Sequence, residues 1–268
     1  MQYDPIKRSL GKVFNQSPFS RKLFYNLLDV LLLRTWHIHR ELRSWKKSAP
    51  QHPNILDAGS GFGQYSFFMS KFDNQPNILG VDVKTEQIAE CNQFFQAIGK
   101  KNIRFEEADL TQFVQPEKYD LVLCVDVMEH IEEDVLVLTN YCKSLKKGGT
   151  LIISTPSDQG GSDVHEDSDE SFIEEHVRDG YGFQEIIEKA KTAGFSEVNV
   201  KYSYGAPGKI SWRLSMKYPM KMLNVSQAFF VLIPFYYLIV MPFALVLNFL
   251  DVRGHHSTGT GLVVVAKK

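Results

Sequence analysis

Short apolar runs alternate with helical patterns through the middle of the chain. Five runs between residues 54 and 157 have the length and aliphatic content of buried strands, and apolar residues at helical spacing separate them. Strands that alternate with helices form a mostly parallel sheet covered by helices. The predicted strands are 54–60, 77–83, 102–109, 119–127 and 149–157, and the predicted helices are 63–71, 85–98 and 132–147.

The remaining chain adds two strands and two apolar segments. A helix and a strand are predicted at 182–193 and 195–204, and "GLVVVAKK" at 261–268 has the pattern of a closing core strand. These patterns divide the chain into an N-terminal helical cap at 1–49, a core formed by 50–205 and 258–268, and an apolar insertion at 206–257. Ligands of open α/β sheets bind at the carboxyl ends of the strands, so we expect the site there.

Charge and cysteine content narrow the classes of function. The chain has 30 Lys+Arg against 31 Asp+Glu, so no basic field favours a nucleic-acid partner. Cys91, Cys124 and Cys142 have no CxxC spacing, which favours reduced thiols. The N-terminus lacks the continuous apolar region of a secretory signal. We therefore expect a cytoplasmic protein without disulfides.

A glycine-rich loop follows the first predicted strand in "LDAGSGFGQYS". Gly59, Gly61 and Gly63 allow a tight turn and a close approach of the backbone to a ligand, and a helix begins at once. A dinucleotide fingerprint has a glycine where this chain has Ser66, and it does not call for Asp57 two residues before the first glycine. The arrangement D-x-G-x-G-x-G after a strand resembles motif I of the class I S-adenosylmethionine-dependent methyltransferases.

Later segments match this family in order, over roughly residues 50–204 and the closing strand. The resemblance implies a Rossmann-like sheet of six parallel strands and a last antiparallel strand, with S-adenosylmethionine as the cofactor. It places Asp82 at the ribose hydroxyls, although a strand-end acid can also cap the next helix. Asp109 lies beside the adenine in this family. The cofactor-binding residues implied are Asp57, Gly59, Ser60, Gly61, Gly63, Asp82, Val83, Asp109, Leu110, Cys124 and Val125.

The segment "VDVMEHI" supplies the candidates for acceptor chemistry. Methyl transfer from a sulfonium requires positioning above all, and what remains is deprotonation of the acceptor. Asp126, Glu129 and His130 follow the fourth predicted strand, beside the expected methyl group. An imidazole that titrates near neutrality suits a general base, so His130 is the first candidate.

Two other interpretations of this segment stay open. D-x-x-E-H resembles the E-x-x-E-H segment of ubiquinone-type O-methyltransferases and of small-RNA 2′-O-methyltransferases, in which carboxylates and imidazole can hold a divalent metal. Asp126, Glu129 and His130 would then need His165 or His176 to complete a Mg²⁺ or Mn²⁺ site, and we expect no metal. Alternatively, Glu129 and His130 cap the next helix or bind the cofactor's amino group.

The acidic segment 157–180 follows the fifth strand, where this family often carries a substrate lid. Most of its charges fit a solvated loop. His176 and Arg178 are the exceptions, because "EEHVRDGY" resembles an "HVR" segment that helps to close the site in many of these methyltransferases. We count His176 among the catalytic candidates for that reason.

The insertion predicts contact with a membrane. Residues 222–250 carry no charge. This segment is long enough for one helical crossing of a membrane, whereas two crossings would need roughly 40 apolar residues. One crossing would separate the closing strand from its sheet, so we expect a re-entrant or surface-lying hairpin broken near Pro234 and Pro242. A core hairpin or a dimer interface is the alternative. The flank suits an anionic headgroup layer through Lys209, Arg213, Lys217, Lys221, Trp212 and Tyr218.

Residues 20–47 repeat this composition, with an apolar middle and basic, tryptophan-containing edges. They predict a cap helix that packs over the cofactor or contacts the membrane.

These features together predict a monotopic methyltransferase on the inner face of the cytoplasmic membrane, with residues 209–250 against the lipid. Its expected acceptor is lipophilic, first of all a hydroxyl on a lipid-linked aromatic or quinone-type molecule, with a lipid amine or carboxylate left open. A soluble small-molecule methyltransferase that dimerises through the hairpin is the first alternative. A cofactor-binding membrane scaffold without turnover is the second. The sequence does not fix the oligomeric state.

Overall fold

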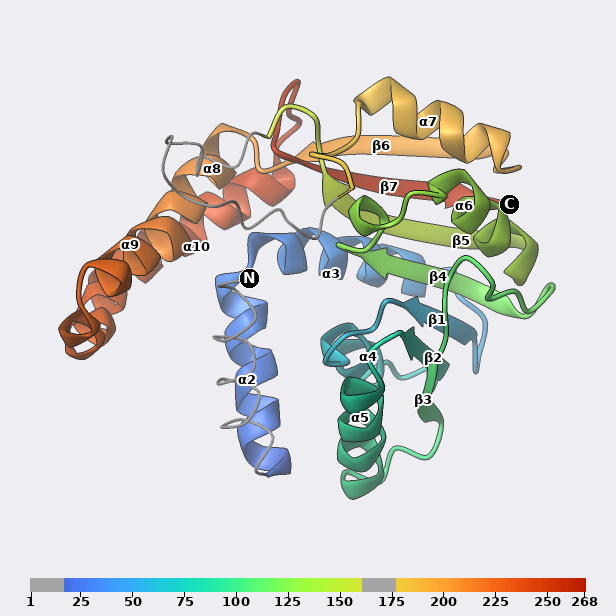
Figure 1. Cartoon of the computed structure of the whole chain (residues 1–268), viewed down its shortest axis with the longest axis horizontal. Helices are drawn as coiled ribbons and strands as arrows, with labels where there is room; N and C mark the ends of the chain where they lie inside the picture. Colours follow the sequence, from blue (N-terminus) through green and yellow to red (C-terminus); the bar gives the residue numbers. More distant parts are fainter. Residues whose placement is uncertain (1–16, 161–176) are drawn as a thin grey trace.

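A seven-stranded sheet organises the molecule in the computed structural model, which describes residues 17–160 and 177–268. The strand order is β3-β2-β1-β4-β5-β7-β6, and only β7 runs antiparallel, pairing with β5 on one side and β6 on the other (Figure 1). This confirms the predicted fold. The strands are β1 (Asn54–Ala58), β2 (Asn77–Asp82), β3 (Ile103–Glu107), β4 (Tyr119–Val125), β5 (Leu145–Pro156), β6 (Glu197–Ser203) and β7 (Gly261–Lys267).

Helices cover both faces of the sheet, and each face has its own apolar core. On one face α4 (Gln64–Met69) and α5 (Thr85–Ala97) bury an aromatic cluster that includes Phe67, Phe94 and Phe95. On the other face α6 (Asp134–Ser144) and α7 (Phe183–Thr192) bury Tyr141 and Ile186. The helix predicted at 132–147 ends at Ser144, and β5 begins at Leu145.

The described part of the N-terminal cap, from residue 17 onward, forms two helices where the sequence predicted one over residues 20–47. α2 (Pro18–Leu31) and α3 (Leu33–Lys46) meet at Leu32, whose extended backbone interrupts the helical pattern. The side chain of Ser17 accepts a hydrogen bond from the backbone of Ser20 and so caps α2. Ile38 and Leu42 of α3 are fully buried in the aromatic core. The cap is therefore part of the core of the fold.

The insertion is a helical hairpin that projects away from the sheet (Figure 1). It rises through α8 (Ala206–Trp212), the π-helical η2 (Arg213–Lys217) and α9 (Tyr218–Val225), and it returns through α10 (Ile233–Arg253). The reversal lies at Ser226 and the short 3-10 helix η3 (Gln227–Val231), just before Pro234 in the first turn of α10. The predicted break near Pro242 is wrong, because Pro242 lies inside α10. A proline removes one backbone donor and bends a helix without having to end it.

Two tyrosines join the arms of the hairpin. The Tyr236 hydroxyl donates to the carbonyl of Leu214 at 2.7 Å, and the Tyr237 hydroxyl donates to that of Ser215 at 2.8 Å. Both acceptors belong to η2. The hydroxyls of α10 thus reach carbonyls in the π-helical part of the opposite arm and hold the two arms together.

A buried carboxylate fixes the base of the hairpin to the core. Asp251 lies near the end of α10 and is fully buried. Its oxygens pair with His37 Nε2 of α3 at 2.8 Å and accept the backbone N–H groups of Gly208 at 2.9 Å and Tyr204 at 3.2 Å. One side chain therefore connects α10 to the cap, to α8 and to the end of β6.

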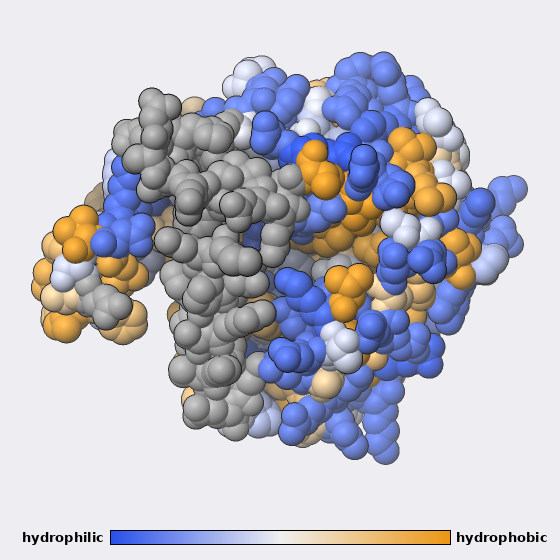
Figure 2. Space-filling view, in the orientation of Figure 1, coloured by the Kyte–Doolittle hydropathy of each residue, from blue (hydrophilic) through white to orange (hydrophobic). Residues whose placement is uncertain are grey.

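The distal part of the hairpin has an apolar surface. Phe235, Leu238, Ile239 and Phe243 of α10 are between 66% and 80% exposed. Figure 2 shows this apolar colouring at the projecting tip. In the part of the chain that the structure describes, α10 is the single helix long and apolar enough to cross a membrane, and 11% of its most apolar window is buried.

Candidate active site

The glycine loop has the backbone geometry of a ligand cradle. Gly59, Gly61 and Gly63 all have positive φ values, of 72°, 48° and 75°, which strain other residues. The N–H groups of Gly59 and Ser60 bind the Val81 carbonyl at 2.8 and 2.9 Å, which fixes the loop across the end of β2. A Cβ atom on Gly59 would lie 2.2 Å from Val127 Cγ2, whereas one on Gly61 would meet only Gln87 Oε1, at 3.9 Å. The loop is packed at Gly59 and open at Gly61.

Asp57 lies in β1 just before this loop and forms a hydrogen bond with α4 just after it. It is 3% exposed, and its carboxylate accepts a 2.6 Å hydrogen bond from the hydroxyl of Ser66 on α4. Burial raises the pKa of Asp57 to about 6, against the lowering effect of Ser66. Ser66 occupies the position where a dinucleotide fingerprint has glycine. The serine that replaces this glycine is the hydrogen-bond partner of Asp57.

Asp82 lies beside the open part of the loop at the end of β2. Its Oδ2 accepts the Gly61 N–H at 2.9 Å, and its Oδ1 accepts the N–H of Lys84 at 3.0 Å. The carboxylate thus orders the loop and also caps the turn into α5. Both roles weighed from the sequence are compatible with this position, because a carboxylate has further lone pairs for a ligand.

The other predicted cofactor residues differ in exposure. Val83 is 63% exposed beyond β2, and Leu110 is buried. Asp109 is exposed and accepts the backbone and hydroxyl of Thr111, which lower its pKa. Cys124 is fully buried in β4, where its sulfur accepts the Tyr141 hydroxyl at 3.5 Å. Val125 ends β4 and is half-buried. The Cys124 side chain therefore belongs to the core, which leaves only its backbone near the site.

A buried hydroxyl in the loop also fits a polar ligand. Ser60 Oγ has no hydrogen-bond partner among the described residues, although the side chain is buried. The Ser60 hydroxyl and the Asp82 carboxylate thus lie beside the glycine backbone, which has open space at Gly61. This donor set fits the nucleoside and amino-acid parts of S-adenosylmethionine.

The acceptor candidates gather at the adjacent strand end. Asp126 follows β4 with a positive φ of 52°, and its carboxylate forms an ion pair with Arg34 of α3. Glu129 is 2% exposed and accepts the Thr155 hydroxyl at 3.2 Å, and burial raises its pKa. His130 ends the 3-10 helix η1 (Met128–His130) with an exposed side chain. Exposure suits a base that hands its proton to water, so His130 remains our predicted base.

No metal site is visible in the described ranges 17–160 and 177–268, where no group of three His, Cys, Asp or Glu side chains is placed to hold an ion. His165 and His176 lie outside the described residues, so the roles predicted for them stay predictions.

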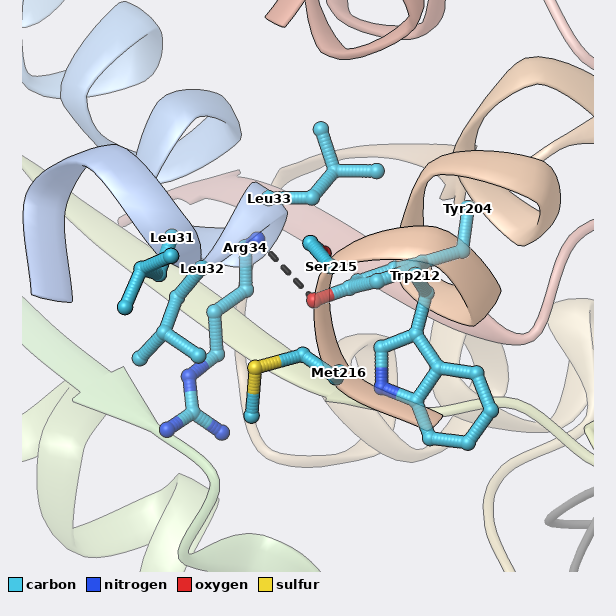
Figure 3. Close-up of a pocket in the computed structure, with 8 residues that line it drawn as sticks. All are labelled: Leu31, Leu32, Leu33, Arg34, Tyr204, Trp212, Ser215 and Met216. Carbon is cyan, nitrogen blue, oxygen red and sulfur yellow. Dashed lines mark hydrogen bonds between the residues drawn. The ribbon is translucent and has the colours of Figure 1, made fainter. Parts of the chain in front are cut away.

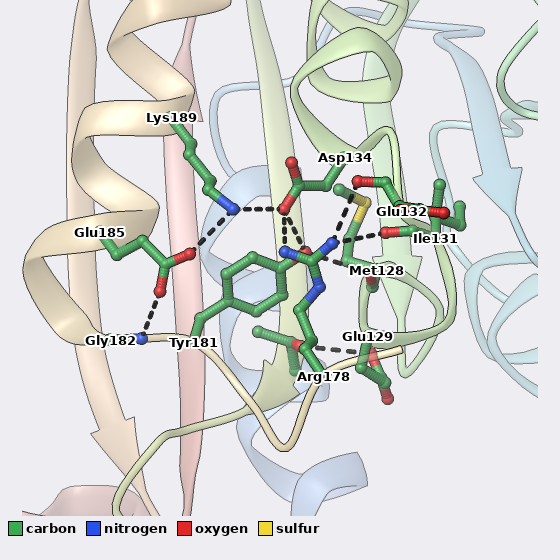
Figure 4. A network of polar contacts seen from close by, with 11 residues as sticks. Met128, Glu129, Ile131, Glu132, Asp134, Arg178, Tyr181, Gly182, Glu185 and Lys189 are labelled. Carbon is green, nitrogen blue, oxygen red and sulfur yellow. Dashed lines mark hydrogen bonds and ion pairs between the residues drawn. The ribbon is translucent and has the colours of Figure 1, made fainter. Parts of the chain in front are cut away.

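Arg178 fastens the segment after the acidic stretch to the acceptor loop (Figure 4). Its guanidinium pairs with Asp134 and donates to the carbonyl of Ile131 at 2.8 Å. Lys189 and the Tyr181 hydroxyl also contact Asp134 Oδ2, at 2.6 and 2.9 Å. The residue singled out in "HVR" thus holds this segment against the loop that carries Glu129 and His130.

Sequence reasoning missed Arg34 and Tyr204. Arg34 lies in "LLLRTW", which has the composition of a cap helix, and it meets Asp126 across 92 positions. The backbone N–H of Arg34 donates to the Tyr204 hydroxyl at 3.1 Å. Tyr204 follows β6 with a positive φ of 54°. No local pattern indicates either contact, because both depend on the packing of the cap against the sheet edge.

Comparisons with known proteins agree with this geometry. A methyltransferase domain family matches residues 51–200. Phosphoethanolamine N-methyltransferase 3 of Arabidopsis thaliana is 30% identical over 161 residues, which cover 54% of this chain and 31% of the relative. The human mitochondrial ubiquinone biosynthesis O-methyltransferase is 30% identical over 105 residues, which cover 38% of this chain and 28% of the relative. The chain thus spans about a third of the length of these curated relatives.

A solved structure supports the fold. Phosphoethanolamine N-methyltransferase 2 of Haemonchus contortus, in complex with S-adenosyl-L-methionine, matches with a TM-score of 0.58 and is 17% identical; the match covers 91% of this chain and 60% of that one. The sheet order, the acid-glycine loop and the family match over residues 51–200 lead to one assignment. This chain belongs to the class I S-adenosylmethionine-dependent methyltransferases.

Proposed function

We propose that this chain transfers a methyl group from S-adenosylmethionine to a lipophilic acceptor held in a membrane. The observation that carries the proposal is the hairpin, whose large apolar side chains face outward while its base is fixed beside the candidate site. Both ends of the hairpin lie at the carboxyl edge of the parallel strands, since it leaves after β6 and returns into β7 opposite the end of β5.

The chain's own groups divide the work of methyl transfer. When bound, the cofactor supplies an electrophilic methyl group on its sulfonium. The glycine loop and Asp82 would hold its nucleoside part, and Ser60 offers a further polar contact. Orientation of the acceptor accounts for most of the rate, and His130 takes the acceptor proton at the end of β4.

A hydroxyl of a lipid-linked aromatic or quinone-type molecule is our first candidate acceptor. The similarity to a ubiquinone biosynthesis O-methyltransferase favours it. The similarity to phosphoethanolamine N-methyltransferases favours methylation of an amine, so a lipid amine is the second membrane-borne candidate. Labelled methyl transfer into a host lipid extract, read by mass spectrometry, distinguishes the two by the atom that gains the label. Absence of label in any lipid, with transfer to a water-soluble compound, would support the soluble alternative.

Removal of the Asp82 carboxylate tests the cofactor site. Asp82→Ala should weaken S-adenosylmethionine binding by about 1–3 kcal/mol, because the ribose hydroxyls lose a charged acceptor. Isothermal titration calorimetry measures the change. Glu86→Ala is the matched control, since Glu86 is an exposed acid on the neighbouring helix α5. Tight binding of a nicotinamide dinucleotide, with no binding of S-adenosylmethionine, would contradict this site.

Membrane attachment is tested on the outward face of α10. We expect the protein to stay on membranes through high-salt washes, because salt screens charges but not apolar burial. Replacing Phe235, Leu238, Ile239 and Phe243 together by serine should release a folded protein that still binds S-adenosylmethionine. These side chains are mostly exposed, so the fold does not depend on them. Leu136→Ser on α6, 46% exposed, is the control and should stay membrane-bound.

The topology has its own readout. Tags at the two ends of the chain should lie on the same, cytoplasmic side in a protease-protection assay. Protection of the C-terminal tag alone would contradict the monotopic arrangement. So would purification of the unmodified protein as a monodisperse species without detergent.

A further inference from the structure

The first cap helix, α2, carries a buried cation on the side that contacts the glycine loop. Arg21 is 3% exposed, although arginine is almost never fully buried without partners. Its Nε donates to the Tyr25 hydroxyl at 2.7 Å, and its two terminal nitrogens donate to the carbonyls of Glu90 at 3.1 Å and Phe62 at 3.0 Å. The guanidinium thus connects α2 to α5 and to the loop.

The carbonyl of Phe62, between Gly61 and Gly63, receives two donors from this one helix. One donor is Arg21, and the other is the hydroxyl of Tyr25, which is fully buried. The N–H on the other side of the same peptide group, that of Gly63, donates to a second loop carbonyl at 2.8 Å. Both sides of the peptide group are therefore held, the carbonyl by the cap and the N–H within the loop.

A further contact joins α2 to the loop where the loop enters α4. Gln64 is the first residue of α4, and its Nε2 donates to Asp29 Oδ1 at 2.7 Å. Asp29 lies two turns after Arg21 on the same helix. The cap helix consequently contacts the chain on both sides of Gly63, through Phe62 and through Gln64.

Beyond this contact, α2 ends beside an unfilled space. Leu31 and Leu32 line a pocket between the cap and the base of the hairpin, together with Trp212 and Met216 of the rising arm (Figure 3). An unfilled space lacks the van der Waals contacts that a packed surface supplies. The placement of α2 therefore depends more on the side that contacts the glycine loop.

The glycines make support from outside the loop important. Gly61 and Gly63 have φ values of 48° and 75°, and glycine adopts other backbone conformations at little cost. A loop built on them therefore visits arrangements that do not fit the cofactor, unless other groups hold it in place. The apparent affinity of a ligand falls with the fraction of protein in the binding-competent state. Contacts that fix the Phe62 peptide group thus strengthen the binding of a ligand to this loop.

We propose that Arg21 is a positioning residue for the cofactor: through the Phe62 carbonyl, and together with Tyr25, it holds the glycine loop in the conformation that binds S-adenosylmethionine. This inference rests on the proposed function, in which the loop holds the nucleoside part of the cofactor. Arg21 acts through the backbone of the loop and touches no reacting atom. The attachment of the cap then sets the affinity for the cofactor.

Titration calorimetry of the full chain with S-adenosylmethionine, in non-ionic detergent, tests the proposal. Arg21→Gln should weaken binding about tenfold or more, because the loop loses a charge-assisted contact. Arg21→Lys should recover part of the affinity, since an ammonium group still donates to the Phe62 carbonyl. Tyr25→Phe removes the neutral donor alone and should weaken binding by about threefold or more.

The matched control removes a buried hydroxyl at the opposite end of the sheet. Tyr119 is 1% exposed, and its hydroxyl donates to Gln115 Oε1 at 2.8 Å at the amino end of β4. Tyr119→Phe should leave the affinity for S-adenosylmethionine unchanged. Unchanged affinity in Arg21→Gln, or an equal loss of affinity in Tyr119→Phe, would overturn the proposal.

Hydrogen exchange separates positioning of the loop from a general loss of stability, and it requires no bound cofactor. In Arg21→Gln and Tyr25→Phe the amides of residues 58–66 should exchange faster, while those of β5 and β7 keep their protection. Faster exchange throughout the sheet, or unchanged exchange in the loop, would overturn the proposal. Turnover of labelled cofactor with lipid extract should show a raised KM for S-adenosylmethionine and an unchanged kcat.

The outcomes separate this inference from the proposed function. Loss of affinity in Asp82→Ala but not in Arg21→Gln would overturn the role of Arg21 alone. Cofactor binding that depends on Arg21, with no label transferred to any lipid, would contradict the proposed acceptor alone. An unmodified protein that does not bind S-adenosylmethionine would contradict both.

Discussion

Replacement of His130 by alanine is expected to lower turnover by roughly 10²–10⁴ and to leave S-adenosylmethionine affinity nearly unchanged. The reason is the position of this imidazole at the end of η1, next to the strand that carries the predicted methyl-transfer edge. Glu129 is a weaker candidate, because its carboxyl is buried and already accepts the Thr155 hydroxyl. Asp126 is paired with Arg34. Single-turnover rates with saturating cofactor measure the effect.

Two comparisons make this result specific. His52→Ala removes an exposed histidine just before β1, at the amino end of the parallel strands and away from their carboxyl ends, and should retain full turnover. A chelator that abolishes activity, with recovery in Mg²⁺ or Mn²⁺, would indicate the metal alternative. Full activity of the alanine variant would remove His130 from the mechanism.

Replacement of Asp251 by alanine should lower the free energy of unfolding by about 3–5 kcal/mol, because buried polar groups left without a partner cost roughly 1–3 kcal/mol each. The variant leaves His37 without its partner and leaves the buried N–H groups of Gly208 and Tyr204 without an acceptor. Urea unfolding in non-ionic detergent, followed by circular dichroism, measures the change.

The matched control is an exposed acid on the surface of the core. Asp73→Ala removes a carboxylate that is 82% exposed and forms an ion pair with Lys46, so it should change stability by less than about 1 kcal/mol. An Asp251 variant as stable as this control would show that the hairpin is not anchored through its base.

The core of the fold was predictable because its signals are local. Strands β1, β2, β4, β5 and β7 each contain a short apolar run, whereas β3 and β6 begin with alternating apolar and polar residues. The segment from Ile55 to Ala58 leads directly into the glycine loop. The break at Leu32 was not predictable, because the apolar residues continue through it from Leu31 to Leu33. The extended backbone there depends on the packing of two helices against different surfaces, which no periodicity records.

The candidate site divides in the same way. Asp57, Asp82 and the glycines are fixed by short-range patterns, and the structure places them around one loop. The contact between Arg34 and Asp126 could not be predicted, because the sequence around an arginine in an apolar helix does not show which distant acid it pairs with. Asp251 is similar, since a single acid at the end of an apolar helix resembles an ordinary boundary residue until its burial is known.

The place of β7 in the sheet sets an order of events during synthesis. β6 pairs with no strand but β7 in the described sheet, and β7 follows the hairpin in the chain. While the ribosome makes residues 204–260, β6 therefore lacks its neighbour and β5 has an open edge, and the apolar arms have already been made. A nascent chain with these exposed surfaces is prone to aggregate. With the membrane contact proposed above, insertion of the hairpin into lipid would remove this exposure and so favour completion of the sheet.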